Sequence, residues 1–360
     1  MVEEKKVLVL YTGGTIGMMK TTKNNAYAPV AGLFTQFIKE IPKLYDRVLA
    51  AGLNLHCNQL TIKYLNTRII YQIIEYDPLL DSSNMSIKEW KKIATDIEKC
   101  YCYFDGFVVL HGTDTMAFTS SILSFMIEGL NKPIIITGAQ RPIFEDGTDG
   151  ISNFYYSLIF AAAYNISDVC VFFDKVLLKG NRCKKIDCSG FDAFDSPNYP
   201  HLAEITFNNN NNNVTINCNY PLLNRRKISK LSFKYDLVAD VGILYCYPTI
   251  RASDVHAFLE NLHGAVILTF GAGNAPLNDH NMVNTLKQEI DTGLVIINVS
   301  QCLKGTVTSN YEVGCVLNEI GIISGNDITV EAAYAKLVVL LNYLNKAELE
   351  ADVNGEMTVN

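Results

Sequence analysis

The sequence is poor in several residues and motifs that other protein classes need. It contains one tryptophan and six histidines in 360 residues, and its ten cysteines include no Cys-x-x-Cys pair. The missing pair excludes the usual zinc-ribbon and disulfide-oxidoreductase patterns, and unpaired thiols are typical of a reducing compartment. We therefore expect reduced, buried cysteines, among them Cys170, Cys246 and Cys302 in apolar strands.

A basic surface is also lacking. Lysine and arginine number 30 against 37 aspartates and glutamates, which gives a formal net charge of −7. Nucleic acids and anionic membranes bind basic surfaces, so we expect neither as a partner. The N-terminus shows no signal-peptide pattern, and no apolar stretch is long and charge-free enough to span a bilayer. These absences predict a cytoplasmic protein.

What is present is an alternation of strand and helix patterns. Short apolar runs indicate buried strands, and apolar residues at helical spacing indicate helices between them. Ser86 and Glu89 form a capping-box pattern at the start of one helix. The βαβα order predicts an α/β protein with a mostly parallel sheet and helices on both faces. The expected strands are 5–11, 105–111, 132–138, 168–173, 240–247, 265–270 and 294–299, and the expected helices are 86–102, 116–129, 150–164, 252–262, 280–291 and 329–346.

The length of the chain allows two domains. We expect a larger N-terminal domain over residues 1–220, a linker over 221–237 and a smaller C-terminal α/β domain over 238–348. The run of six asparagines at 208–213 is too polar to pack and predicts a loop or hairpin tip. The polar tail, residues 349–360, is expected to be frayed.

Two strand-to-turn blocks carry the strongest functional signal. The block 7–17 ends in Thr-Gly-Gly-Thr-Ile-Gly, and the block 108–115 ends in His-Gly-Thr-Asp-Thr. Glycines let the backbone turn sharply and approach a small molecule closely. Because α/β sheets bind ligands at the carboxyl ends of their strands, the blocks predict a site that uses the hydroxyls of Thr15 and Thr113.

A threonine hydroxyl is a weak nucleophile and needs a base nearby. The scattered histidines form no Ser-His-Asp pattern, and we expect His111 to be a structural, hydrogen-bonded residue. A desolvated lysine whose amine is neutral can act as a base. Thr113, Lys185 and Asp114 could form such a relay, with Asp114 orienting the other two. We expect Thr115 to cap the helix that follows.

Several sequence blocks, in unbroken order over residues 5–346, resemble the bacterial-type L-asparaginase family and its cytosolic type I branch in particular. Two threonine blocks in this order are specific, whereas either one alone would be weak. The blocks are Leu-Tyr-Thr-Gly-Gly-Thr-Ile-Gly (10–17), Asp-Ser-Ser-Asn-Met (81–85), His-Gly-Thr-Asp-Thr-Met-Ala (111–117), Ile-Thr-Gly-Ala-Gln-Arg-Pro (136–142), Gly-Asn-Arg (180–182), Gly-Phe-Asp-Ala-Phe-Asp-Ser-Pro-Asn (190–198) and Gly-Ala-Gly-Asn-Ala-Pro (271–276).

The resemblance implies an L-asparagine amidohydrolase that releases L-aspartate and ammonia through a β-acyl-enzyme, with no metal and no cofactor. Thr15 would be the nucleophile, and Tyr27, on a flexible lid, would orient it. Thr113, Asp114 and Lys185 would form a second triad.

The same resemblance implies a substrate site for a zwitterion. Ser82 would hold the α-carboxylate of L-asparagine, and Asp114 and Ser83 would hold its α-ammonium. Asn274 would contribute to the site of a neighbouring subunit, so a homodimer or homotetramer is implied.

The sequence departs from the family pattern at the lysine. Lys184 and Lys185 are adjacent, and Lys185 is preferred because it precedes Phe194 by the nine residues of the family pattern. Lys184 is the alternative.

Other functions remain open on the sequence alone. A glutaminase-asparaginase of broader specificity would use the same residues, since one methylene distinguishes the substrates and is worth only about 1–3 kcal/mol. The asparaginase-like subunit of a tRNA-dependent amidotransferase is disfavoured by the acidic composition. A non-catalytic protein could hold a small ligand with the glycine turns, although 13–17 matches neither the dinucleotide-binding nor the P-loop pattern.

Overall fold

The computed structural model describes residues 2–20, 27–30, 32–56, 58–208, 213–223, 229–277, 280–308 and 312–359. The chain divides into two compact units. Unit 1 comprises residues 1–123, 127–196 and 200–233, and unit 2 comprises residues 124–126, 197–199 and 234–360. The change of unit after residue 233 falls within the segment 221–237 that the sequence analysis expected to be a linker.

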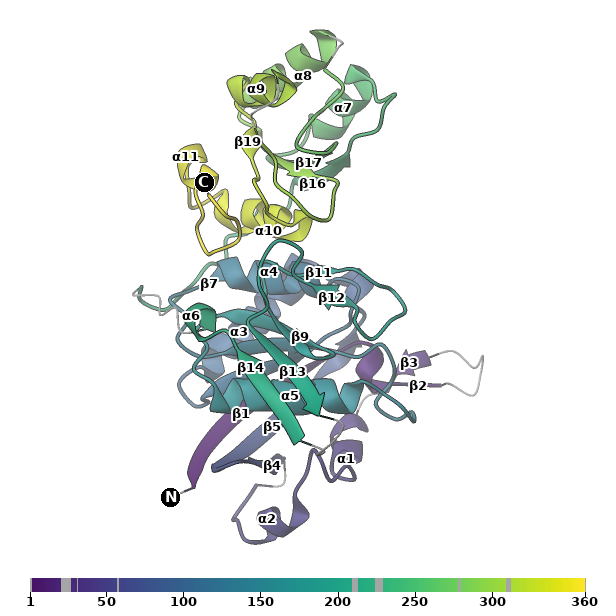
Figure 1. The fold of residues 1–360 in the computed structure, drawn as a ribbon, viewed down its shortest axis with the longest axis vertical. Helices are drawn as coiled ribbons and strands as arrows, with labels where there is room; N and C mark the ends of the chain where they lie inside the picture. Colours follow the sequence, from purple (N-terminus) through teal and green to yellow (C-terminus); the bar gives the residue numbers. More distant parts are fainter. Residues whose placement is uncertain are drawn as a thin grey trace. The chain divides into compact units, whose positions relative to one another are not determined.

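The main sheet of unit 1 contains β1 (Glu3–Gly13), β4 (Gln59–Tyr64), β5 (Thr67–Leu80), β6 (Gly106–Leu110), β8 (Ile134–Thr137), β9 (Val169–Phe173), β10 (Val176–Lys179), β13 (Ala203–Asn208) and β14 (Asn213–Cys218). The strand order is β14-β13-β10-β9-β8-β6-β1-β5-β4, and Figure 1 labels β14, β13, β9, β1, β5 and β4 of this sheet. The central pairs β5–β1, β1–β6, β6–β8 and β8–β9 are parallel. The outer pairs β4–β5, β9–β10, β10–β13 and β13–β14 are antiparallel. The predicted mostly parallel sheet is confirmed, with antiparallel edges that the sequence analysis did not foresee.

The helices that accompany this sheet are α1 (Phe34–Ile38), α2 (Arg47–Ala51), α3 (Ile87–Cys100), α4 (Met116–Met126), α5 (Gly150–Ala163) and α6 (Tyr220–Leu223). Ser86 caps α3 and forms the predicted capping box with Glu89. Helix α3 buries Trp90, Ile93 and Ile97 on one face, as expected for an amphipathic helix. Helix α5 lies along the sheet and contacts β1, β5, β6, β8 and β9 (Figure 1).

Short elements complete this part of the chain. They are the 3-10 turns η1 (Thr15–Gly17) and η2 (Ser82–Asn84) and the two-stranded ladders β2 (Met18–Lys20) with β3 (Tyr27–Pro29), β7 (Ile127–Glu128) with β15 (Ser232–Phe233), and β11 (Lys184–Lys185) with β12 (Phe194–Asp195).

The sheet brings the two threonine blocks to one edge. Strands β1 and β6 are neighbours in parallel, with Val7 opposite Gly106 and Tyr11 opposite Leu110. The residues from Val7 to Tyr11, and all of β6, are buried, because a central parallel strand is covered on both faces. The turns that follow the two strands therefore begin side by side.

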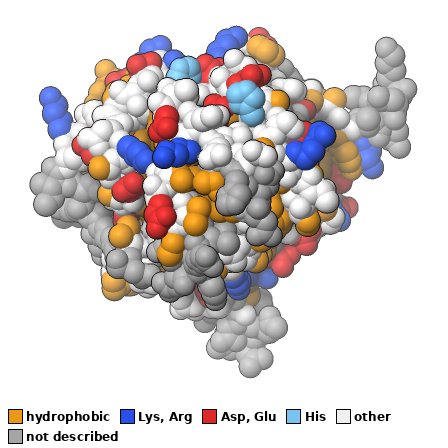
Figure 2. Space-filling model, turned by 90° about the horizontal axis from the view of Figure 1, so that it is seen from above, with side chains coloured by type: hydrophobic (Ala, Val, Ile, Leu, Met, Phe, Trp, Pro, Cys, Tyr) orange, Lys and Arg blue, Asp and Glu red, His pale blue; other side chains and the backbone are white. Residues whose placement is uncertain are grey.

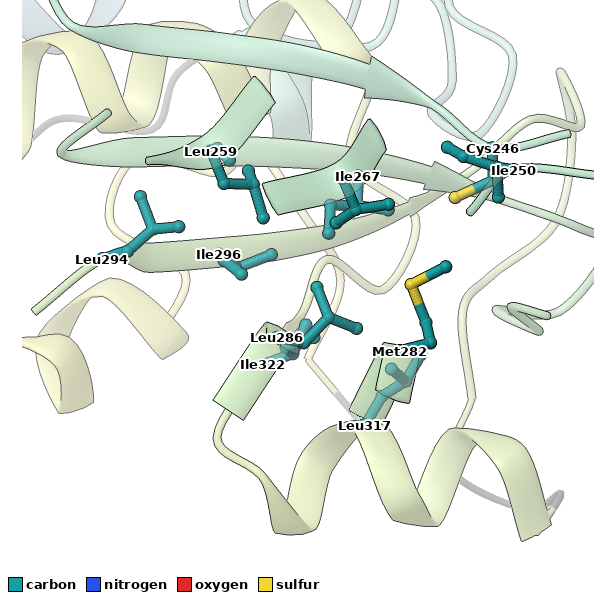
Figure 3. Close-up of a cluster of buried hydrophobic side chains, with 12 residues drawn as sticks. Cys246, Ile250, Leu259, Ile267, Met282, Leu286, Leu294, Ile296, Leu317 and Ile322 are labelled. Atoms are coloured by element: carbon teal, nitrogen blue, oxygen red, sulfur yellow. The ribbon is translucent and has the colours of Figure 1, made fainter. Parts of the chain in front are cut away.

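Unit 2 is a smaller α/β unit with a fully parallel sheet. Its strand order is β16-β17-β18-β19. In Figure 3, apolar side chains from the strands and helices of unit 2 point toward one another and form its core. Each such buried aliphatic side chain contributes about 1.5–3 kcal/mol. The elements are β16 (Val241–Tyr245), β17 (Gly264–Thr269), β18 (Val295–Ser300), β19 (Ile323–Ser324), α7 (Ala252–Leu259), α8 (His280–Asp291), α9 (Glu312–Glu319), α10 (Val330–Leu340) and α11 (Lys346–Glu350).

Two expectations about packing are wrong. The C-terminal tail is not frayed over its described residues, because Glu356 and Met357 are buried and Thr358 N–H donates to Asp327 at 2.6 Å. Cys302 is exposed just after β18, whereas Cys170 and Cys246 are buried as predicted.

The asparagine run belongs to the hairpin β13–β14. Asn208 lies opposite Asn213 in the register, which agrees with the predicted hairpin position, and residues 209–212 lie outside the described part of the chain. Among the described residues, no helix has the length and apolar character needed to cross a bilayer. On the face seen in Figure 2, acidic and basic side chains are interspersed.

Candidate active site

The site begins at the turn that follows β1. Gly13 and Gly14 have φ angles of 137° and 89°, in a region that residues other than glycine rarely adopt. A Cβ added at Gly14 would lie 2.5 Å from both the Cα and the N atom of Gly112. The two turns therefore touch backbone to backbone, and a side chain at Gly14 would push them apart.

Thr15 is the first residue of η1 and is half-buried. The turn is closed by a hydrogen bond from Gly17 N–H to the Gly14 carbonyl at 3.3 Å. Gly17 packs directly on the Tyr11 side chain, where a Cβ would overlap the phenol. Tyr11 is itself buried and stacks on Phe34 with 4.3 Å between ring centroids. Packing beneath the turn thus fixes the backbone that carries Thr15.

The second threonine block is joined to a lysine. Lys185 Nζ donates to Thr113 Oγ1 at 2.9 Å and to Asp114 Oδ1 at 2.8 Å. Thr113 is 6% exposed, whereas the Asp114 side chain is 64% exposed. The three predicted residues form one hydrogen-bonded cluster, and an amine at this distance can exchange a proton with the Thr113 hydroxyl.

The ladder β11–β12 selects which lysine joins the cluster. Lys184 lies opposite Asp195, and Lys185 lies opposite Phe194. Phe194 is buried, with its ring centroid 4.9 Å from that of Phe173. Because successive residues of a strand point to opposite faces, only one of the two adjacent lysines can turn toward the cluster. The structure places Lys185 there.

The predicted substrate-binding serines lie in η2, directly after β5. Ser82 is buried, and a Cβ added at Gly112 would collide with Ser82 Oγ. Ser83 is exposed, and its N–H donates to the Asp81 carboxylate at 3.0 Å. The Ser82 hydroxyl therefore lies beside the contact between Gly14 and Gly112, at the same edge of the sheet.

Thr115 connects the second block to η2. Its hydroxyl donates to the Ser82 carbonyl at 2.6 Å. Thr115 does occupy the N-cap position of α4, but its side chain makes no capping hydrogen bond. The predicted capping role is wrong, because the hydroxyl binds the neighbouring turn instead.

Tyr27 lies on β3, opposite Lys20 in the ladder with β2. Its hydroxyl donates to Glu145 Oε1 at 2.5 Å, and the side chain is 43% exposed. The structure therefore pairs the Tyr27 hydroxyl with a carboxylate and does not bring it to Thr15 as a hydrogen-bond partner.

His111 has a structural role. Its Nδ1–H donates to the Gly112 carbonyl at 2.6 Å, so Nε2 accepts from Thr119 Oγ1 at 2.9 Å. Thr119 Oγ1 in turn accepts from Trp90 Nε1 at 3.0 Å. Burial lowers the pKa of His111 to about 4, so the ring is neutral near pH 7. Both ring nitrogens are used, as the sequence analysis expected of a hydrogen-bonded histidine.

Gln140 adjoins the cluster and was given no role from the sequence. Thr113 Oγ1 lies 3.5 Å from Gln140 Oε1, and Gln140 Nε2 donates to the Gly190 carbonyl at 3.0 Å. Asp149 accepts the backbone N–H groups of Gln140 and Arg141 at 2.9 and 3.0 Å. Burial raises the pKa of Asp149. The only sequence signal for Gln140 was its place in the block 136–142.

Asn274 belongs to unit 2, where its N–H and carbonyl pair with the backbone of Phe270, both at 2.8 Å. It is thus the one predicted site residue outside unit 1. Over the described residues, no group of three or more His, Cys, Asp and Glu side chains could hold a metal ion.

The sequence matches two known families in consecutive segments. Residues 6–220 match "Asparaginase, N-terminal", and residues 240–350 match "Glutaminase/Asparaginase C-terminal domain". The Escherichia coli (strain K12) protein called L-asparaginase 1 is 37% identical over 99% of both chains. The Mus musculus protein called 60 kDa lysophospholipase is 42% identical over 99% of this chain and 63% of its own length.

The chain spans about three fifths of the length of the first curated relatives it matches, namely 61%, 63% and 62%. Its fold agrees with the crystal structure of L-asparaginase I from Vibrio cholerae, with a TM-score of 0.83 and 36% identity over 99% of this chain and 100% of the other. The threonine blocks, the order of the two units and these similarities agree, and the chain belongs to the asparaginase family, in the type I bacterial branch.

Proposed function

We propose that the protein is an L-asparaginase, which hydrolyses L-asparagine to L-aspartate and ammonia. The observation that carries the proposal is the cluster in which Lys185 donates to both Thr113 and Asp114, at the sheet edge that also holds Thr15. A hydroxyl joined to an amine beside a second hydroxyl suits acyl transfer better than simple ligand binding.

In the first half-reaction Thr15 Oγ attacks the side-chain amide carbon of L-asparagine. The C–N bond breaks, ammonia leaves with the hydroxyl proton, and a β-aspartyl ester remains on Thr15. Backbone N–H groups near Gly14 and Thr113 are the proposed donors to the oxyanion, and such donors supply about 3–4 kcal/mol.

In the second half-reaction water attacks the ester. The Thr113–Lys185 pair accepts the proton of this water, Asp114 holds the lysine, and Thr15 regains its proton as L-aspartate leaves. This assignment rests on the 2.9 Å separation of Lys185 Nζ and Thr113 Oγ1, which is within the range for direct proton transfer.

The substrate is a zwitterion, and both hydroxyl groups and a carboxylate lie near the threonines. We assign the α-carboxylate to the buried Ser82 hydroxyl and the α-ammonium to Asp114 and the exposed Ser83. Tyr27 remains the proposed partner of Thr15, and in that role its hydroxyl would exchange Glu145 for Thr15.

A homodimer or homotetramer and a cytoplasmic location complete the proposal. The assembly follows from Asn274, which we propose to act in the site of a neighbouring subunit. The location follows from the reduced cysteines, since none of the described ones forms a disulfide.

The test is ammonia release by the purified protein over a wide range of L-asparagine, with L-glutamine in parallel. Strong release from L-asparagine and little from L-glutamine supports the proposal, and equal release from both supports the broader glutaminase-asparaginase. A third assay with lysophosphatidylcholine addresses the activity named for the mouse relative. Release of fatty acid without ammonia would overturn the proposal.

A further inference from the structure

A histidine outside the proposed catalytic set bridges two carboxylates in unit 1. His201 Nε2 lies 2.8 Å from Asp195 Oδ1, and His201 Nδ1 lies 2.7 Å from Glu204 Oε1. Asp195 ends β12 and Glu204 belongs to β13. The imidazole therefore joins the short ladder β11–β12 to the edge region of the main sheet.

The residue pair that contains Asp195 is adjacent in the β11–β12 ladder to the pair that contains Lys185. Asp195 is opposite Lys184, and the preceding residue, Phe194, is opposite Lys185. Beyond these two residue pairs, the N–H groups of Ile186 and Asp187 donate to the Ala193 carbonyl at 2.8 and 3.4 Å, so the two segments are joined on both sides of Lys185. A constraint on Asp195 is thus a constraint on the backbone that carries Lys185.

The protonation state of His201 decides whether both contacts are hydrogen bonds. Carboxylates only accept, so the imidazolium satisfies Asp195 and Glu204 together, whereas the neutral ring can donate to one of them. Partial burial disfavours the charged ring, but the hydrogen bonds and charges of Asp195 and Glu204 outweigh it and raise the pKa of His201 above its ordinary value of 6.5.

The charged residues on the strands paired with β12 and β13 are Lys184 and Lys185 on β11 and Lys179 on β10, whose amine donates to Asp168 at 2.7 Å. Lys184 lies on β11, opposite Asp195. Lys175 directly precedes β10, and its amine lies 3.8 Å from Asp174. The carboxylates of Asp195 and Glu204 are therefore the acidic groups that hydrogen-bond the ring.

We propose that His201 is a positioning residue for Lys185. In its protonated form, His201 joins β12 to β13 as a clamp and so holds the β11–β12 ladder in the geometry that the reaction needs. The inference rests on the proposed function, because it assigns the clamp to the lysine of that site. The clamp is complete below the pKa of His201 and loses one hydrogen bond as the pH rises through it.

The experiment compares wild-type protein with His201→Gln over a range of pH. Glutamine keeps one donor and one acceptor, so it resembles the neutral ring. We expect the ratio of wild-type to variant kcat/KM for L-asparagine to fall from about tenfold in mild acid to about one in alkali, since small misplacements of a catalytic group can cost up to about a hundredfold. The midpoint should equal the His201 pKa measured by NMR. Taking the ratio cancels the titration of groups common to both proteins.

Two further variants sharpen the result. Glu204→Gln keeps the ring but removes one carboxylate, so the midpoint should move to lower pH. His256→Gln is the matched control, because His256 also pairs with a carboxylate, Glu289, at 2.6 Å but lies in unit 2. Its ratio should not change with pH. A ratio for His201→Gln that is flat with pH would overturn the inference.

An NMR measurement separates failure of the clamp from failure of the proposed function. The Lys185 ¹³Cε resonance, assigned with Lys185→Arg, should shift with the same midpoint as His201 in wild-type protein and lose that shift in His201→Gln. If the protein released no ammonia, the proposed function would fail while this shift still showed the coupling. A Lys185 resonance that ignores the His201 titration would refute the clamp whatever the activity.

Discussion

The amine of Lys185 lies within hydrogen-bond distance of Thr113 and Asp114, and its neighbour Lys184 provides a natural comparison. We expect Lys185→Met to lower kcat by at least about a hundredfold, because general-base contributions are typically about 10²–10⁴-fold. Lys184→Met should stay within about threefold, since the ladder points that side chain to the other face. Steady-state ammonia release measures both. The reverse order of effects would assign the catalytic role to Lys184.

The two threonines are expected to act as a unit. Thr15→Ala removes the nucleophile and Thr113→Val removes the relay hydroxyl, so each should lower kcat by about a thousandfold or more. The double variant should have a kcat only slightly below that of the less active single variant, because the effects of substitutions in one catalytic mechanism are not additive. Circular dichroism should show an unchanged fold. Substantial turnover by either single variant would argue against a mechanism that uses both threonines.

At this scale the sequence predicted which residues gather but not all their partners. Thr113 and Asp114 follow from their block because the end of a strand defines their positions, whereas Lys185 follows from its nine-residue spacing to Phe194 in the family pattern. The hydroxyl of Thr115 was misassigned because a capping site and a neighbouring carbonyl compete for it, and only the fold decides. The pairing of Tyr27 with Glu145 joins segments far apart in the chain and leaves no local pattern.

Among the elements, the C-terminal segment shows how a polar stretch can pack. Lys336 on α10 is 1% exposed and Glu356 is fully buried, with 2.7 Å between Nζ and Oε1. Lys336 also donates to the Ala351 carbonyl at 2.6 Å, and Glu356 accepts the N–H groups of Val353 and Asn354. This buried ion pair and its hydrogen bonds hold the segment after α11 against α10.

Removing one partner of this ion pair should destabilise the protein. Lys336→Met leaves a buried carboxylate unpaired and should lower the free energy of unfolding by about 3–5 kcal/mol at neutral pH. The double variant Lys336→Met with Glu356→Leu should recover much of the loss, since apolar replacement of a buried pair is often neutral. Urea denaturation measures both, with the exposed Lys346→Met as control. A single variant as stable as wild type would contradict this account.

The same pair predicts a pH dependence. Burial would raise the pKa of Glu356, but the charge of Lys336 and hydrogen bonds outweigh it and hold the pKa below its ordinary value of 4.5. A carboxyl with a depressed pKa contributes stability above its unfolded value and loses it as the pH falls through the folded value. The difference in unfolding free energy between wild type and Lys336→Met should therefore shrink in acid.

The elements that the sequence revealed are those with a regular apolar pattern. β1, β6 and α3 were found because their patterns are continuous. β5 was missed because Gln72 and Glu75 interrupt its apolar residues, and the two-residue strands β11 and β12 are too short to show any period. The packing of the tail could not be predicted, because composition does not reveal that Lys336 forms a buried ion pair with Glu356.

For the whole molecule, the proposed role of Asn274 in a neighbouring site can be tested by mixing inactive subunits. Thr15→Ala and Asn274→Ala proteins should each be nearly inactive. If Asn274 acts across subunits, a mixed dimer contains one complete site, and random exchange in a two-fold dimer restores about a quarter of wild-type activity. Ammonia release after subunit exchange measures this. No recovery in confirmed mixed oligomers would place Asn274 in its own subunit's site.

The contact between Gly14 and Gly112 has a consequence for any attempt to redesign substrate preference. Two positions far apart in the sequence share one small volume. Many members of a mutational library that varies either position would therefore fail to fold. Diversity is better placed at side chains that leave this contact intact, such as Gln140 beside Thr113 or the exposed Ser83. The contact between the two glycines must therefore be kept in any redesign, whereas the side chains around it can be varied.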